Sequence, residues 1–143
     1  MNNELLKANI HLINDGIKFS CKSNDNPEII TDYYPPLGNN EGFKPLELFL
    51  ISFGTCVSGT IIPLLRRFKK SIDKYFIDIE GVKRNEHPTS FEKIKISILV
   101  YSKDVEDTDL EKAIKMSEDK YCPVWAMIKN NVEVEIKYKI ERR

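Results

Sequence analysis

Neither sign of charge is in excess in this sequence: its 143 residues contain 22 Lys and Arg and 22 Asp and Glu. Without a large field of one sign, nucleic acid and anionic membranes are not expected as main partners, and small neutral substrates remain open. A chain of this length is expected to form a single domain, residues 1–143, with about two-thirds of its unfolded surface buried.

Cysteine is scarce, with three residues in the chain, and no positively charged leader with an apolar segment and cleavage site is present. We therefore expect free thiols in a reducing cytoplasm. Residues 48–65 carry no charge and are just long enough to suggest a membrane span. They include Ser, Thr, Gly and Pro, and the amphipathic remainder of the chain needs them as a core, so no membrane association is expected.

Several motifs of cofactor and metal sites are also missing. No glycine-rich nucleotide loop and no CxxC occurs, and no second Cys or His lies at ligand spacing from Cys56 or Cys122. No cofactor or metal is therefore expected, and a zinc site would need residues far apart in sequence. His11 and His87 could act as general bases, but we assign neither a catalytic role.

Two short strands are predicted near the N-terminus, over residues 9–13 and 17–21. The Asp15-Gly16 pair between them favours a tight hairpin turn with positive φ. Cys21 shares a face with Phe19 at the two-residue period of a strand, which predicts a small core residue more than a reactive thiol.

A long ordered loop is predicted over residues 22–44, which are rich in Asn, Pro and Gly. Only residues 28–33 look extended, and Pro35-Pro36 prevents regular structure. Loops of this length in compact domains usually serve a site or pack against a partner.

A helix is predicted to begin at Pro45, with Glu47 in its first turn, where a negative charge suits the positive end of the helix dipole. Its apolar stripe consists of Leu46, Phe49, Leu50, Phe53, Val57, Ile61 and Leu64. Leu48, Ile51 and Ile62 are also apolar, so the helix has almost no polar face. We therefore expect a helix that is buried on nearly all sides and that kinks or ends near Pro63.

Three strands with alternating polarity are predicted over residues 75–83, 93–101 and 132–140. Between the last two, Thr108 to Glu111 forms a capping-box pattern that opens a helix, and Cys122-Pro123 begins a shorter one. The order of strands, buried helix, two strands, two helices and a strand predicts an α+β fold.

Cys56 lies within the long helix, and Cys122 lies at the start of a short one. Exposed N–H groups at a helix N-terminus stabilise a thiolate, so local physics predicts a lowered pKa for Cys122 and favours it as the reactive thiol. From composition alone, the commoner interpretation is that each cysteine is a small buried hydrophobe.

The sequence resembles the OsmC/Ohr family, as a member of its broad group rather than of the branch dedicated to organic hydroperoxide resistance. The similarity runs from about Tyr34 to Ile140 and is carried by Pro35-Pro36-Leu37-Gly38, Lys44 to Cys56, Gly81 to Arg84, His87-Pro88, Phe91, Ile94 and Ser117 to Val124. It implies an α+β fold in which antiparallel sheets wrap around a long buried central helix. It also implies an intertwined homodimer with two active sites at the interface.

The resemblance implies a thiol-dependent peroxidase in which Cys56 attacks the peroxide and Cys122 resolves the sulfenic acid as a disulfide. This reverses the choice made from helix position. A small organic hydroperoxide would be the substrate, and an external dithiol would reduce the disulfide. The same dimer could instead act as a non-enzymatic ligand-binding or redox-sensing protein, and a zinc-binding protein is a third alternative.

The remaining site residues follow from the same resemblance. Glu47 is assigned to the catalytic group, although as a first-turn residue it could simply interact with the helix dipole. Phe49, Phe53, Tyr121 and Trp125 are expected to line an apolar substrate pocket, or equally to pack in the core. The dedicated branch holds its thiolate with an N-terminal arginine, whereas the first arginine here is Arg66. Lys18 or a residue of a second subunit would have to replace this arginine, or the protein would be a slow peroxidase.

Overall fold

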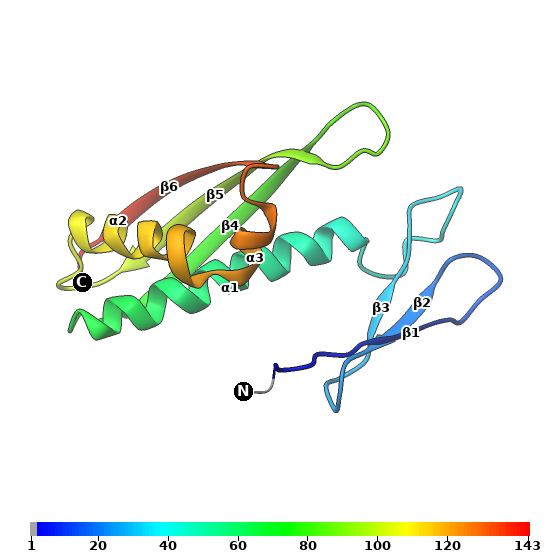
Figure 1. Cartoon of the computed structure of the whole chain (residues 1–143), viewed down its shortest axis with the longest axis horizontal. Coiled ribbons are helices and arrows are strands. Elements are labelled where there is room, and N and C mark those ends of the chain that lie inside the picture. Colours follow the sequence, from blue (N-terminus) through cyan, green and yellow to red (C-terminus); the bar gives the residue numbers. More distant parts are fainter. Residues whose placement is uncertain (1–2) are drawn as a thin grey trace. The chain divides into compact units, whose positions relative to one another are not determined.

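The computed structural model describes residues 3–143 and divides into two compact units. Unit 1 extends to Phe49, and unit 2 runs from Leu50 to Arg143. Each unit has its own three-stranded sheet, β1-β2-β3 in unit 1 and β4-β5-β6 in unit 2. The α+β class and the long central helix predicted from the sequence are confirmed (Figure 1).

The sheet of unit 1 is antiparallel and contains β1 (Asn9–Leu12), β2 (Phe19–Lys22) and β3 (Ile29–Thr31). The predicted hairpin is therefore present, but its predicted tight turn is wrong, because Gly16 does not have a positive φ. The connection between β1 and β2 is longer than a two-residue turn, because it comprises residues 13–18. Asn14 closes it by accepting hydrogen bonds from the N–H groups of Gly16 and Lys18, at 3.0 and 3.1 Å. An Asx-type side-chain bond thus replaces the glycine turn.

A buried carboxylate organises the loop after β3. Asp32 is 0% exposed, and its two oxygens accept hydrogen bonds from the N–H groups of Tyr33, Asn39 and Glu41 at 2.8, 3.2 and 3.1 Å. Gly38 is required here because a Cβ would lie 2.3 Å from an Asp32 oxygen. The long loop predicted from the sequence is therefore ordered around one acidic side chain.

Helix α1 (Pro45–Arg67) begins at the predicted proline. Glu47 accepts a hydrogen bond from the N–H of Lys44 at 2.8 Å, which is one half of a capping box. Of the two expectations for Pro63, an end there is wrong, because the helix continues to Arg67, and a kink there stays a prediction. Proline removes one main-chain hydrogen bond, and the packing of the following turn is sufficient to continue the helix.

Burial of α1 on nearly all sides is also wrong for a single chain. One face is buried, and it consists of Phe53, Gly54, Val57, Ile61, Leu64 and Leu65. By length and composition α1 could cross a membrane, with a mean hydropathy of 2.0 over its most apolar window. Its buried face instead packs within unit 2, where a Cβ on Gly54 would lie 3.6 Å from Ile79 of β4.

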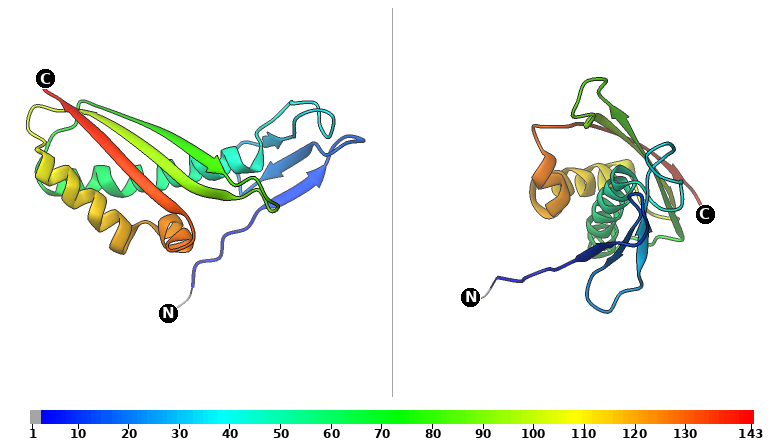
Figure 2. Two further views of the ribbon diagram at one scale, coloured as in Figure 1. Left: turned by 90° about the horizontal axis from the view of Figure 1, so that it is seen from above. Right: turned by 90° about the vertical axis from the view of Figure 1, so that its right-hand side faces the viewer.

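The sheet of unit 2 contains β4 (Lys74–Lys83), β5 (Phe91–Tyr101) and β6 (Glu133–Glu141), at the three predicted positions. β4 and β5 are antiparallel, whereas β5 and β6 are parallel, so this sheet is mixed and the expectation of a purely antiparallel sheet is wrong here. A parallel pair needs a crossover connection, and the helical segment between β5 and β6 provides it. The helices lie on one face of this sheet (Figure 2).

The crossover contains α2 (Asp107–Met116), a π-helix η1 (Ser117–Tyr121) and α3 (Pro123–Ile128). The predicted capping box at Thr108 is wrong by two residues. Helix α2 begins after Glu106, whose N–H donates to Asp109 at 2.9 Å. The carboxylate of Asp109 therefore closes the first turn in place of the Thr108–Glu111 pair. No sequence signal had predicted the π-helix.

Candidate active site

The structure brings the two singled-out thiols together. Cys56 projects from α1 and Cys122 precedes α3, and both are free cysteines with their sulfur atoms 3.0 Å apart. The geometry has the Cys122 S–H donating to the Cys56 sulfur. A disulfide bond is about 2.05 Å long, so a small approach of the two sulfurs would allow it to form. The two cysteines are 66 positions apart in sequence, and no local signal predicts their contact.

The exposure of the two thiols differs. Cys122 is 2% exposed, whereas Cys56 is half-buried. Cys122 is the N-cap of α3, and its sulfur accepts a hydrogen bond from the N–H of Trp125 at 3.4 Å. This is the helix-start position that the sequence predicted.

The predicted lowering of the Cys122 pKa is wrong. Burial and the donation of its proton to Cys56 together raise its pKa to about 11, against the lowering effect of the N–H groups of Trp125 and Val124. Desolvation therefore outweighs the helix N-terminus. Cys122 keeps its proton at neutral pH, which removes the local argument for Cys122 as the more reactive thiol.

The predicted aromatic residues are found in different surroundings. Phe53 and Trp125 are buried and meet edge to face, with ring centroids 5.6 Å apart. They come from the same two segments as the thiols, because Phe53 lies three residues before Cys56 and Trp125 three residues after Cys122. Tyr121 is exposed, with the Lys120 ammonium over its ring. The roles of these four side chains, including the half-buried Phe49, remain predictions.

Other predicted residues lie in unit 1. Glu47 is engaged in capping α1 through Lys44, and Lys18 pairs with Glu41 at 3.5 Å. Cys21 is half-buried and so is not the core residue that was expected. Its sulfur lies 3.9 Å from the Thr31 hydroxyl. The strand period placed Cys21 and Phe19 on one face correctly, but unit 1 does not cover that face.

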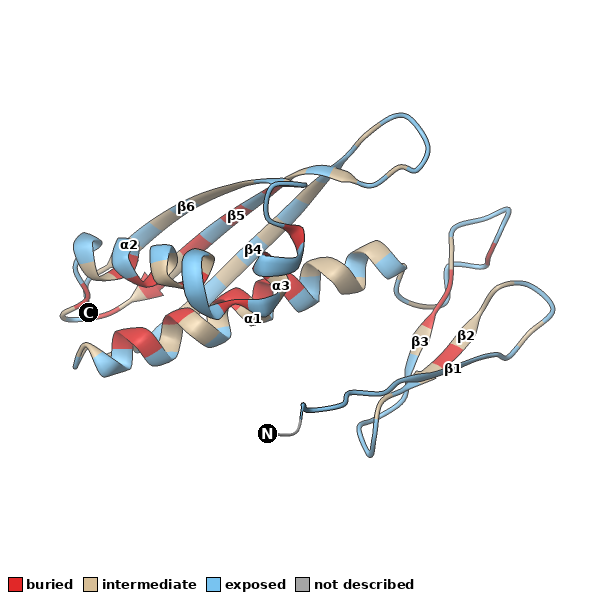
Figure 3. Cartoon of the chain, in the orientation of Figure 1, coloured by how far each residue is buried: buried red, intermediate tan, exposed pale blue. Residues whose placement is uncertain are grey.

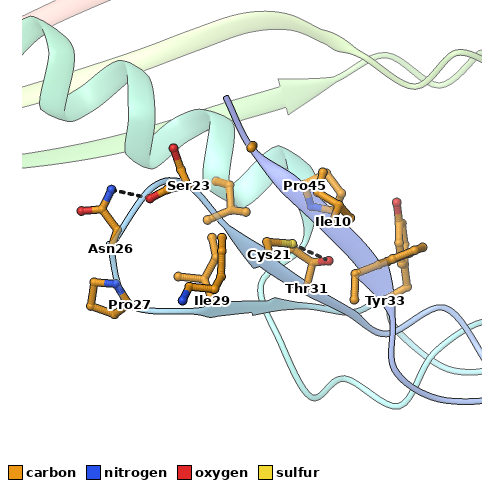
Figure 4. A pocket seen from close by; sticks show the side chains of 13 residues that line it. Ile10, Cys21, Ser23, Asn26, Pro27, Ile29, Thr31, Tyr33 and Pro45 are labelled. Atoms are coloured by element: carbon orange, nitrogen blue, oxygen red, sulfur yellow. Dashed lines mark hydrogen bonds between the residues drawn. The ribbon is translucent and has the colours of Figure 1, made fainter. Parts of the chain in front are cut away.

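That face of unit 1 forms an open pocket of about 540 Å³. Figure 4 shows Cys21 and Thr31 in it, between Ile10 on β1 and Ile29 on β3. Pro45 and Leu48 from the first turn of α1 complete the lining. The lining is mostly apolar, so this region presents hydrophobic side chains to the outside of the unit.

No three side chains among His, Cys, Asp and Glu gather as a metal-ligand group anywhere in residues 3–143. Both histidines are exposed, His11 on β1 and His87 in the connection between β4 and β5.

Comparison with known proteins identifies a family whose matched region contains the thiol pair. The family model described as OsmC-like protein matches residues 38–137, which contain both thiols and the whole of α1. The chain belongs to the OsmC-like protein family. The similarity to this family found in the sequence is thus confirmed.

Relatives of this OsmC-like chain extend over nearly its full length. Protein YhfA of Escherichia coli strain K12 is 24% identical over 129 residues, covering 88% of this chain and 92% of that protein. The crystal structure of a hypothetical protein from Aquifex aeolicus VF5 is 28% identical, with a TM-score of 0.86 and 99% of each chain covered. An organic hydroperoxide resistance protein OsmC from Legionella pneumophila shares the fold at 16% identity, with a TM-score of 0.73 over 97% of this chain and 99% of that one.

Proposed function

We propose that this OsmC-like protein is a thiol-dependent peroxidase that reduces organic hydroperoxides, with Cys56 as the nucleophile and Cys122 as the resolving thiol. The observation that carries the proposal is the 3.0 Å contact between two free thiols on separate segments of the fold. The name of the Legionella relative supports the substrate class. We place the reaction in a reducing cytoplasm, where such a pair can be returned to the thiol state.

We assign the roles of the two thiols from the hydrogen bond that Cys122 donates to Cys56 and from their exposure. Cys122 is buried and keeps its proton because its pKa is raised to about 11. It can donate that proton toward Cys56, so a thiolate at Cys56 would have a donor 3.0 Å away. The half-buried sulfur of Cys56 is also the one that a substrate can reach more easily.

In the first step, the Cys56 thiolate attacks the terminal oxygen of the hydroperoxide. The S–O bond forms as the O–O bond breaks, so the sulfur is oxidised by two electrons and an alkoxide leaves and takes up a proton as the alcohol. In the second step, Cys122 displaces hydroxide from the Cys56 sulfenic acid, and a disulfide and water are formed. An external dithiol then reduces the disulfide and is itself oxidised.

The buried Phe53–Trp125 pair is proposed to form the apolar wall against which the organic part of the substrate lies. It lies next to the thiols in sequence on both segments. Glu47 is proposed to act indirectly, by fixing the first turn of α1, since its carboxylate caps the Lys44 N–H. These assignments favour substrates with an apolar substituent over hydrogen peroxide.

We also propose that the active form is a homodimer. The side chains of Ile10 and Leu12 in unit 1 are 64% and 53% exposed, and the pocket around Cys21 is apolar and open. Tyr34, Leu37 and Phe43 of the following loop are exposed as well. Apolar surface gathered in this way on a small unit is typical of an interface.

The test is dithiothreitol-dependent consumption of cumene hydroperoxide by the full chain. Cys56→Ser should abolish turnover, and Cys122→Ser should stop at a sulfenic acid that dimedone can trap. Cys21→Ser is the matched control, since it removes the third thiol, in unit 1, and should leave the rate unchanged. An undiminished rate in Cys56→Ser would refute the proposal.

The alternative of a redox-sensing dimer uses the same thiol pair and gives a different result. In that case the wild-type protein would form the Cys56–Cys122 disulfide once and show no sustained turnover with dithiothreitol. Metal analysis of protein purified without chelator tests the zinc alternative, for which stoichiometric zinc is the required result.

A further inference from the structure

A second polar contact joins the same two segments as the thiol pair. The hydroxyl of Thr60 on α1 lies 2.5 Å from the hydroxyl of Ser117, the first residue of the π-helix η1. Ser117 is 0% exposed, and Thr60 is half-buried. A buried hydroxyl without a partner is costly, so this pair fixes how the two segments meet.

The hydrogen bonds of the pair can be assigned by counting donors. Each hydroxyl has one hydrogen. Thr60 donates its hydrogen to the Val57 carbonyl at 2.8 Å, so the hydrogen between the two hydroxyls comes from Ser117. The chain of donors runs from Ser117 to Thr60 to the main chain of α1. Removing either hydroxyl breaks it.

The hydroxyl pair and the thiol pair are two contacts between α1 and the segment from Ser117 to Cys122, and these two segments run antiparallel. On α1, Thr60 lies four residues after Cys56, which places both on the same face one turn apart. On the other segment, Cys122 lies five residues after Ser117. The N–H of Cys122 donates to the Ser117 carbonyl at 2.9 Å, which is the i to i−5 bond of a π-helix.

The π-helix explains how these two spacings match. In an α-helix the residue above a given position is three or four residues away, so a spacing of five would rotate Cys122 away from Ser117. The wider turn of η1 takes up the additional residue and stacks Cys122 over Ser117. Single π-turns occur often at functional sites.

We propose that the Thr60–Ser117 hydroxyl pair is a positioning device that anchors η1 to α1 and thereby holds the Cys122 sulfur within bonding reach of Cys56. This rests on the proposed function for its catalytic meaning, but the positioning itself does not require a peroxide. Thr60 and Ser117 are positioning residues and touch no reacting atom. Their role lies in the second step, in which the Cys56 sulfenic acid and the Cys122 thiol become a disulfide and water.

The test separates the two chemical steps in Thr60→Val and Ser117→Ala. Sulfenic acid formation, followed by dimedone trapping, should stay within twofold of wild type, because Cys56 is unchanged. Disulfide formation should slow by about tenfold to a hundredfold, as expected when a reacting group is displaced by about 1 Å. Trp125 is the single tryptophan, and its main-chain N–H donates to the Cys122 sulfur, so the fluorescence of its indole ring can follow this step.

Two further variants distinguish positioning from general destabilisation. Thr60→Ser keeps the hydroxyl and should restore disulfide formation. Thr55→Val makes the same substitution on the same helix, at an exposed hydroxyl that donates only to main-chain carbonyls, and should leave both steps unchanged. Equal slowing of both steps in Thr60→Val and Thr55→Val would overturn the proposal.

A peroxide-free measurement keeps this inference separate from the proposed function. The equilibrium between the two thiols and oxidised dithiothreitol, which yields the Cys56–Cys122 disulfide and reduced dithiothreitol, should shift about tenfold toward the thiols in Thr60→Val and Ser117→Ala. This shift in a protein without peroxidase activity would refute only the proposed function. An equilibrium within twofold of wild type in both variants would refute the positioning role.

Discussion

The two units of the chain bury opposite kinds of side chain. In unit 2 the buried residues are mainly apolar, from Phe53 on α1 to Ile128 on α3. In the described part of unit 1 no hydrophobic side chain is buried, and the buried side chains are those of Ser20, Thr31 and Asp32 (Figure 3). Unit 2 is therefore held together by a hydrophobic core, and unit 1 by a network of polar contacts.

This difference separates the roles of the two units. Unit 2 holds the thiol pair on segments fixed by close packing, as a site that needs accurate geometry requires. Unit 1 leaves its apolar side chains at the surface, where they are available to a second copy. The predictions below test this contrast by changing one unit and using the other as a reference.

The largest effect is expected from a matched pair of leucine truncations. Leu65→Ala removes a fully buried side chain from unit 2 and should lower the free energy of unfolding by about 2–5 kcal/mol. Leu12→Ala removes an exposed side chain of unit 1 and should change it by less than about 0.5 kcal/mol when the chain is monomeric. Urea denaturation at low protein concentration measures both. Equal losses would show that unit 1 has an apolar core of its own.

A charge placed on the exposed face of unit 1 tests the homodimer. Ile10→Lys should weaken self-association at least about tenfold, because a buried unpaired ammonium is strongly unfavourable in an interface. Analytical ultracentrifugation over a range of protein concentrations measures the self-association, and circular dichroism checks that the variant is folded. Met127→Lys is the control, since Met127 is an exposed apolar side chain of unit 2. If Ile10→Lys associates like wild type, the second copy does not cover this face.

The buried Cys122 makes the stability of unit 2 depend on pH. Its folded-state pKa is raised to about 11 by burial and by Cys56, so the folded chain keeps a proton that the unfolded chain has released. Stability should therefore fall as the pH rises from about 9 toward 11, by about 1–3 kcal/mol in total. Urea denaturation of the reduced protein should show this fall, and Cys122→Ala should show a smaller one. Identical pH profiles for the two proteins would contradict the raised pKa.

Much of unit 2 could be predicted from the sequence, because its strands alternate in polarity and its helix starts carry local signals. Pro45 and the alternation from Val132 to Ile140 located the start of α1 and both ends of β6 to within a residue. The contact between Cys56 and Cys122 could not be predicted from spacing, because it depends on the whole fold. Resemblance to a family supplied that expectation.

The errors have a common physical cause. The pKa direction of Cys122 was wrong because burial is a tertiary effect that outweighs the local helix N-terminus. The π-helix at Ser117 has no residue pattern of its own, and its first residue contacts Thr60, which is far away in sequence. The hairpin turn was wrong because the Asn14 side chain accepts hydrogen bonds from the N–H groups of Gly16 and Lys18 and closes the turn without a positive φ at Gly16. In each case a side-chain contact that the sequence pattern did not include decided the outcome.

The smallest effect is expected inside unit 1, at its buried carboxylate. Burial acts to raise the Asp32 pKa, but the N–H donors of Tyr33, Glu41 and Asn39, with Lys18 nearby, lower it below its usual value. Asp32→Asn leaves one acceptor oxygen and places an NH₂ group against these donors. Amide hydrogen exchange at Asn39 and Glu41 should accelerate by at least about tenfold. The N–H of Val105, which donates to the Ser102 hydroxyl in unit 2, is the internal reference and should not change.

The same carboxylate gives a pH test of whether unit 1 opens alone. Because the Asp32 pKa is lowered, its stabilising contribution is complete above the usual pKa of an aspartate, near 4, and is lost as the pH falls further. Protection of the Asn39 and Glu41 amides should therefore persist at pH 5 and decrease below about 4 in the wild type, with Val105 still protected. If all three amides lose protection together, the polar network of unit 1 and the apolar core of unit 2 open as one cooperative domain.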